Sequence, residues 1–118
     1  MATTSERIRI EPHPGRVTVA FGGRTVVDTR RALVLRETGL PPVLYLPRED
    51  AAMEHFEPTS RTTRCPYKGE ASYFTLRAGD RVAENAVWSY ERPIAAAQAI
   101  AGHLAFHPDR VEIKEARI

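Results

Sequence analysis

The stretch from residue 62 to 74 reads TTRCPYKGEASYF and contains the chain's single cysteine, Cys65. Pro66 favours a turn that begins at the cysteine, and the glycine just after it can adopt a left-handed conformation. Arg64 and Lys68 place positive charge beside the thiol, which would favour the nucleophilic thiolate. The same turn could instead hold an anion, because successive main-chain amides and nearby cations attract negative charge.

A catalytic thiol also needs a proton acceptor, and the four histidines of the chain lie far from Cys65 in sequence. A lone cysteine is more often a small packed side chain than a nucleophile, so we favour ligand recognition over sulfur chemistry. An enzyme that uses Cys65 as a nucleophile or redox centre is the first alternative. Thiol reactivity as a function of pH distinguishes the two.

Metal binding is not expected. One cysteine excludes an intramolecular disulfide and a zinc site built from paired cysteines. His103 and His107 are four residues apart, a spacing used by two-histidine metal sites on helices, but no third ligand follows from the pattern. The phosphate-binding patterns GxxxxGK[ST] and GxGxxG are also absent from the sequence. We therefore predict no metal and no cofactor.

Three aromatic side chains are expected to gather beside the cysteine turn. Gly79-Asp80 reads as a two-residue turn between strands over 71–78 and 81–90. That turn predicts cross-strand pairs whose residue numbers sum to a constant: Leu76 with Ala83, Phe74 with Asn85 and Ser72 with Val87. The opposite face then holds Tyr73, Trp88 and Tyr90 at the end reached by CPYKG. Large flat rings beside a few polar groups are typical of a ligand pocket, although a second small core is the alternative.

Composition indicates one soluble domain. The chain has 118 residues, of which 17 are basic and 15 acidic, giving a formal net charge of +2 with both signs interleaved. Nucleic acid is therefore an unlikely partner, and no apolar run is long enough to cross a bilayer. We expect a cytoplasmic location and a small-molecule partner. The oligomeric state is left open, a homo-oligomer included.

The pattern of elements predicts a mainly β domain of the α+β type. Strands are expected over 7–12, 31–37, 42–47 and 110–118, and a hairpin over 16–29 with a turn at Gly22-Gly23. One or two helical turns are expected over 48–56. The main helix is predicted from about Ile94 to His107, in an alanine-rich segment that follows Pro93. An extended segment over 1–15 is expected to precede the domain at 16–118.

Four longer segments resemble a known family: RRALVLRETGLPPVLYLPRED, TTRCPYKGEASYF, ENAVWSYERP and AIAGHLAFHPDRVEI. They look like the bacterial domain-of-unknown-function family four-two-seven, also labelled nucleotidyltransferase-like, and the resemblance runs from about Arg16 to Val111. It implies a β-tent fold, in which two antiparallel sheets meet at an angle, with one helix in the C-terminal half. Relatives with this fold include domains that bind small ligands in an aromatic cage.

The resemblance also supplies site residues, which join Arg64 from the charge argument. The positions that match are Arg36, Tyr45, Asp50, Cys65, Tyr67, Lys68, Tyr73, Trp88 and Tyr90. We therefore predict a pocket for an anionic or aromatic polar ligand between the CPYKG turn and the aromatic face. A module that binds protein or nucleic acid is the remaining alternative, and salt-dependent binding to polynucleotide tests its nucleic-acid form.

Overall fold

The computed structural model describes residues 3–4 and 7–117, and most of them lie in strands. The strands are β1 (Thr3–Thr4), β2 (Ile8–Pro12), β3 (Gly15–Phe21), β4 (Arg24–Thr29), β5 (Leu33–Glu37), β6 (Val43–Tyr45), β7 (Phe56–Cys65), β8 (Gly69–Ala78), β9 (Arg81–Ser89), β10 (Ala105–Phe106) and β11 (Glu112–Arg117). Short 3-10 helices occupy η1 (Arg48–Asp50), η2 (Met53–His55) and η3 (Ala95–Ile100). The mainly β fold predicted from the sequence is confirmed.

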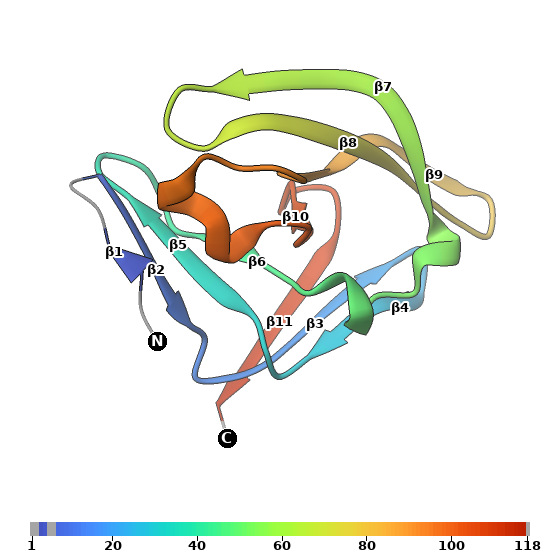
Figure 1. Cartoon of the computed structure of the whole chain (residues 1–118). Coiled ribbons are helices and arrows are strands. Elements are labelled where there is room, and N and C mark those ends of the chain that lie inside the picture. Colours follow the sequence, from blue (N-terminus) through green and yellow to red (C-terminus); the bar gives the residue numbers. More distant parts are fainter. Residues whose placement is uncertain (1–2, 5–6, 118) are drawn as a thin grey trace.

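The described strands form three antiparallel sheets, ordered β1-β2-β5-β6, β10-β9-β8-β7 and β11-β3-β4. Two sheets were predicted. Figure 1 shows the long strands β7 and β8 along one side of the molecule and the β11-β3-β4 sheet along the other. β6 and β10 lie between them, and the residues directly next to these strands form a single bridge, Leu46 with Leu104. The segment before residue 16 contributes β2, which pairs with β5.

Alternation of apolar and polar residues explains most of these strands. In β3, Val17, Val19 and Phe21 are buried while the residues between them are more exposed. The turn to β4 uses Gly22 and Gly23, both at positive φ, as a two-residue hairpin turn requires. The strand over 56–65 was not predicted, because FEPTSRTTRC is mostly polar and exposed and does not alternate. It forms β7, and CPYKG is the loop that joins it to β8.

The helix predicted over Ile94 to His107 is much shorter in the structure. Helical backbone ends at Ile100, and Ala97 already departs from helical angles inside η3. Gly102 follows at a φ of +71°, which stops the helix, and the next residues enter β10. Alanine propensity was overridden because pairing with β9 and with Leu46 satisfies main-chain groups of Leu104, Ala105 and His107 instead. The turns predicted over 48–56 are the 3-10 helices η1 and η2.

The β8–β9 hairpin has the predicted turn but a shifted register beyond it. Leu76 pairs with Ala83 as predicted, whereas Phe74 pairs with Val87 instead of Asn85. Asn85 has a positive φ of +52°, and its main-chain N–H donates to the Thr75 hydroxyl at 3.2 Å. This geometry marks a β-bulge. Ser72 accordingly pairs with Ser89 instead of Val87. Because the shift is of two residues, the paired side chains on either side of the bulge keep their predicted faces.

Two clusters of buried side chains make the core. The larger one contains Val17, Val19, Leu76, Val87 and Leu104 among its members. The smaller one contains Ile8, Ile10, Leu35, Tyr45, Tyr90 and Ile100, with Cys65, Tyr73 and Trp88 packed against its edge. Within the described ranges, no helix has the length and apolar character that a membrane span requires.

Candidate functional site

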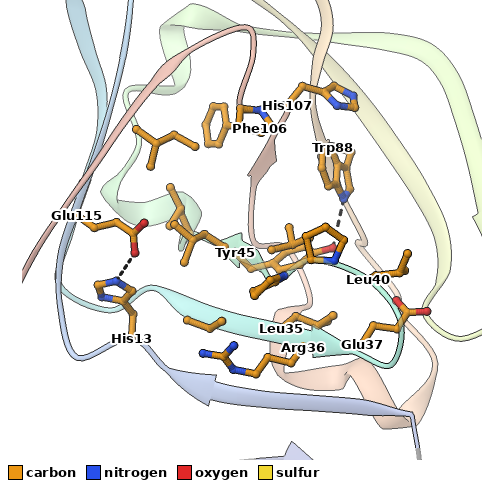
Figure 2. Close-up of a pocket in the computed structure, with 18 of the residues that line it drawn as sticks. His13, Leu35, Arg36, Glu37, Leu40, Tyr45, Trp88, Phe106, His107 and Glu115 are labelled. Atoms are coloured by element: carbon orange, nitrogen blue, oxygen red, sulfur yellow. Dashed lines mark hydrogen bonds and ion pairs between the residues drawn. The ribbon is translucent and has the colours of Figure 1, made fainter.

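A groove of about 1220 Å³ opens around β6. Its walls come from β5, β6, the ends of β8 and β9, β10, the segment after it, and β11. Figure 2 shows that Trp88 and His107 lie at one side of this groove and His13 with Glu115 at another, with Tyr45 between them. The groove therefore lies where all three sheets approach one another.

The aromatic end of the groove holds four of the predicted residues, Tyr45, Tyr73, Trp88 and Tyr90. Tyr73 pairs directly with Trp88 across β8 and β9, so their side chains share a face. Trp88 donates its indole N–H to the Tyr45 hydroxyl at 3.3 Å, and the rings of Tyr45 and Tyr90 have centroids 6.4 Å apart. The predicted gathering of these rings is present, with Tyr45 and Tyr90 buried and the other two half-buried.

The hydroxyls at this end differ in their partners. The Tyr73 hydroxyl is hydrogen-bonded to Thr63 Oγ1 at 3.0 Å. The Tyr45 hydroxyl accepts from Trp88, and its own proton has no acceptor among the described residues. Tyr90 is only 6% exposed, and its hydroxyl has no hydrogen-bond partner in the described part of the chain. The O–H groups of Tyr45 and Tyr90 are therefore both without a hydrogen-bond acceptor among the described residues.

Burial makes both phenols harder to ionise. It raises the pKa of Tyr45 to about 12, although the hydrogen bond from Trp88 acts in the opposite direction. Burial also raises the pKa of Tyr90 well above its ordinary value, and the neighbouring Tyr45 adds to the effect. A phenolate is unfavourable in a poorly hydrated site, so these groups remain O–H donors at alkaline pH as well as at neutral pH.

Lys68 points inward from the loop between β7 and β8, where it forms an ion pair with Glu37 at the end of β5. The side chains are 10% and 6% exposed, so this pair is buried. Arg7 Nε lies 3.8 Å from the other Glu37 oxygen. The Lys68 carbonyl accepts from the Ile94 amide at 2.9 Å, which attaches the loop to the segment before η3. Lys68 was predicted to neutralise a bound anion, yet Glu37 already compensates its charge.

At the opposite end, His13 Nε2 is 2.8 Å from Glu115 Oε1, and its Nδ1 accepts from the Gly15 amide at 3.0 Å. Because Nδ1 is an acceptor, the proton of the neutral ring is on Nε2 and is donated to Glu115. Arg36, also on the groove, donates to Glu11 at 3.0 Å. Among the charged side chains along the groove, Arg36, Glu37 and Lys68 are therefore in ion pairs within the protein, and Glu115 accepts a hydrogen bond.

Four other predicted site residues do not line the groove. Asp50 accepts from Thr29 at 2.7 Å and from Arg31 at 3.2 Å, and these two bonds hold its pKa below the usual range. Arg64 is exposed on β7, and Tyr67 is exposed with the Arg7 guanidinium 4.2 Å from its ring centroid. Cys65 is half-buried against the smaller core cluster.

The histidines have other partners than the thiol. His55 contacts the Arg77 carbonyl, His103 contacts the Ala101 carbonyl, and the His107 ring centroid lies 4.8 Å from that of Trp88. In the part of the chain that the structure describes, none is hydrogen-bonded to Cys65, and no group of three or more His, Cys, Asp or Glu could hold a metal ion. His103 and His107 lie on either side of β10, so the prediction that both lie on one face of a helix is wrong.

Sequence reasoning missed Glu37, His13, Glu115 and His107 as groove residues. Glu37 ends an alternating strand at a position that is buried by that alternation, which is a readable signal for a paired charge. The other three come from segments that only the tertiary fold brings together.

The comparisons with known proteins agree with the predicted resemblance. No curated protein matches the chain. The family described as Domain of unknown function (DUF427) matches residues 9–117, which is nearly the whole chain and includes every residue of the groove. The chain therefore belongs to the DUF427 family.

Proposed function

We propose that this domain binds a small, uncharged ligand with an aromatic or apolar body and a hydrogen-bond acceptor, held at the aromatic end of the groove. The observation that supports it best is the Tyr90 side chain, which belongs to the smaller core cluster and lines the groove, and whose hydroxyl has no hydrogen-bond partner among the described residues. The hydroxyl oxygen itself is not buried, since Arg48 Nε is the one buried side-chain polar atom without a partner in the described part of the chain, so the acceptor of a ligand in the groove can reach it. The Tyr45 proton supplies a second donor.

The charges of the groove favour an uncharged ligand over the anion predicted from the sequence. Lys68 is paired with Glu37, Arg36 with Glu11 and His13 with Glu115. An anion would have to compete with a carboxylate that is already in place, and breaking a buried ion pair is costly. Neutral phenols and an indole ring instead supply flat contact area and directed donors, as small-molecule sites commonly do.

The test uses Trp88, the single tryptophan of the chain, as an internal reporter. We would titrate the protein with a panel of uncharged aromatic compounds that carry a carbonyl, and with their carboxylate counterparts, while following fluorescence and thermal stability. Binding at this end should change the Trp88 emission and raise the melting temperature with dose, because a ligand that binds only the folded state stabilises it.

Tyr90→Phe removes the free hydroxyl and keeps the ring, so it should weaken binding about tenfold, the loss expected for one hydrogen bond of about 1.4 kcal/mol. Tyr67→Phe is the matched control, because that tyrosine is 41% exposed and lies outside the groove. Equal loss in both variants, or no response to any compound of the panel, would contradict the proposal.

A further inference from the structure

Lysine is rare in this chain, and one of its two lysines is buried beside the groove. Of the 17 basic residues only Lys68 and Lys114 are lysines, and the others are arginines. Lys114 is exposed on β11, whereas the Lys68 side chain is 10% exposed and lines the groove. An arginine would pair well with a carboxylate at this position, but it does not lose its proton in proteins. A lysine amine that loses its proton is a nucleophile, so Lys68 has a chemical capacity that arginine lacks.

Glu37 is placed to take a proton from Lys68. Its carboxylate forms an ion pair with the ammonium group, and both side chains are buried. In a poorly hydrated site, transfer of the proton from the ammonium to the carboxylate replaces two buried charges by two neutral groups, which reduces the desolvation penalty. Arg7 Nε lies 3.8 Å from the other carboxylate oxygen, so the two oxygens of Glu37 face different cations. The pair therefore combines a nucleophile with its base.

The main chain on which Lys68 lies is fixed. The Lys68 carbonyl accepts from the Ile94 amide at 2.9 Å, and the Lys68 amide donates to the Cys65 carbonyl at 3.3 Å. The side chain is held at its far end by Glu37. A nucleophile that is already positioned beside a cavity reacts with a bound molecule without the entropic penalty of bringing the two together.

The same end of the groove supplies donors for a carbonyl oxygen. The hydroxyls of Tyr45 and Tyr90, whose residues line the groove, have no acceptor among the described residues. The negative charge of Glu37 contributes to the raised pKa of both phenols, which indicates that the carboxylate lies close enough to interact with them. Figure 2 shows Glu37 on the Trp88 side of Tyr45. A carbonyl oxygen that accepts from either phenol is polarised, and its carbon becomes more electrophilic.

We propose that Lys68 forms a reversible imine with an aromatic or apolar aldehyde held at the aromatic end of the groove, and that Glu37 is the base. This inference rests on the proposed function and names the class of ligand.

The reaction needs no further reagent. The Lys68 ammonium passes a proton to Glu37, the free amine bonds to the carbonyl carbon, and an electron pair of the C=O bond moves to the oxygen, which takes the proton from Glu37. A second proton moves from the nitrogen to the oxygen by the same route, and the oxygen leaves as water while the nitrogen lone pair forms the C=N bond. The protonated imine keeps its ion pair with the Glu37 carboxylate.

The test is reductive trapping with benzaldehyde, phenylacetaldehyde and hexanal in the presence of cyanoborohydride, which converts an imine into a stable secondary amine. Peptide mapping by mass spectrometry then gives the rate of modification at each lysine of the wild type. Lys114 is the internal reference, because it is exposed and lies on another strand. With at least one aldehyde, Lys68 should be modified at least tenfold faster than Lys114. Modification of Lys68 at the rate of Lys114 or more slowly, with all three aldehydes, would overturn the inference.

Two variants provide matched controls. Lys68→Arg keeps a cation beside Glu37 but forms no imine, so the fast phase of modification should disappear while the protein stays folded. Lys114→Arg should leave the fast phase unchanged. A fast phase that persists in Lys68→Arg would show that another amine reacts. The wild-type map decides the question even where a variant is less stable, because it compares two lysines of one molecule.

Benzamide separates this inference from the proposed function. It presents the ring and a carbonyl acceptor to the groove but does not condense with an amine, so it should bind and should slow the trapping of benzaldehyde at Lys68 and not at Lys114. If benzamide binds but no aldehyde is trapped preferentially at Lys68, the imine inference is wrong and the proposed function stands. If neither benzamide nor any aldehyde binds or reacts at the groove, both are wrong.

Discussion

The Trp88 indole donates to the Tyr45 hydroxyl at 3.3 Å, and this bond joins β9 of one sheet to β6 of another. It fixes both rings at the aromatic end of the groove and holds the Tyr45 oxygen in a buried position, with the residue only 1% exposed. Burial is the main reason why the Tyr45 phenol resists ionisation.

Stability should therefore fall at alkaline pH, in part through Tyr45. Its pKa is raised to about 12 in the folded state, from an ordinary value of 10.0. Below pH 10 the Tyr45 phenol is protonated in both the folded and the unfolded state, so its ionisation does not lower the free energy of unfolding. Between pH 10 and 12 the unfolded chain loses the proton first, so the free energy of unfolding should decrease by about 1.4 kcal/mol per pH unit.

Urea denaturation of the wild type and of Tyr45→Phe, measured from pH 8 to 11.5, isolates this contribution. The variant should show a shallower decline above pH 10, since its unfolded state has one phenol fewer to ionise. Parallel curves for the two proteins would show that Tyr45 ionises equally easily in both states.

The buried pair of Lys68 and Glu37 predicts a large cost for losing either partner. Lys68→Met leaves the Glu37 carboxylate in a buried site, where the more exposed Arg7 guanidinium at 3.8 Å compensates its charge only in part, and should destabilise the protein by about 3–5 kcal/mol. Lys114→Met is the matched control, because that lysine is exposed on β11, and it should change stability by about 0.5 kcal/mol or less.

A double variant completes this test. Replacing both partners, as in Glu37→Leu with Lys68→Met, leaves no unpaired charge and should cost clearly less than the sum of the single changes. Additive costs, measured by urea denaturation at neutral pH, would show that the two charges are not coupled.

The glycines of the β3–β4 turn should respond differently to the same substitution. Both have positive φ, so an alanine costs about 1–2 kcal/mol of backbone strain at either position. A Cβ on Gly22 would also lie 2.9 Å from the Ala78 carbonyl at the tip of β8, whereas a Cβ on Gly23 would meet nothing within 4 Å. Gly22→Ala should therefore be less stable than Gly23→Ala by roughly 1–3 kcal/mol. Equal melting temperatures would show that the turn can move away from β8.

Cys65 should react slowly in the folded protein. Its side chain is half-buried against the smaller core cluster, and no described histidine is placed to take its proton. Labelling with a chromogenic disulfide at pH 7.5 should be at least tenfold slower in buffer than in denaturing urea, because reaction requires an accessible thiolate. A native rate above the denatured rate would instead support the enzyme alternative and identify Cys65 as an activated thiol.

The sequence predicted the strands well where the pattern is local and regular, as in β3, whose alternating residues are buried in turn. It failed where a single residue changes the geometry. Gly102 ends the alanine-rich helix early, and the positive φ of Asn85 introduces the bulge that shifts the β8–β9 register. Neither effect can be read from propensity, because in both places tertiary pairing decides between alternatives of similar energy.

The rings that were predicted to lie together do so, whereas the charged side chains have partners that the sequence did not indicate. Tyr73 and Trp88 belong to neighbouring strands of one hairpin, so their proximity follows from local pairing. The direction of Lys68 depends on Glu37, 31 residues away, and only the finished fold brings the two together.

The loop Pro66–Lys68 has a consequence for engineering of this domain. Hairpin tips usually accept inserted residues, tags or new termini, since little of the chain depends on them. In this loop the Lys68 carbonyl accepts from the Ile94 amide, and the Lys68 ammonium group forms an ion pair with Glu37. Its length should therefore be invariant, whereas the tip at Gly79-Asp80, where an added Cβ on the glycine meets no atom, offers the better position for an epitope or a circular permutation.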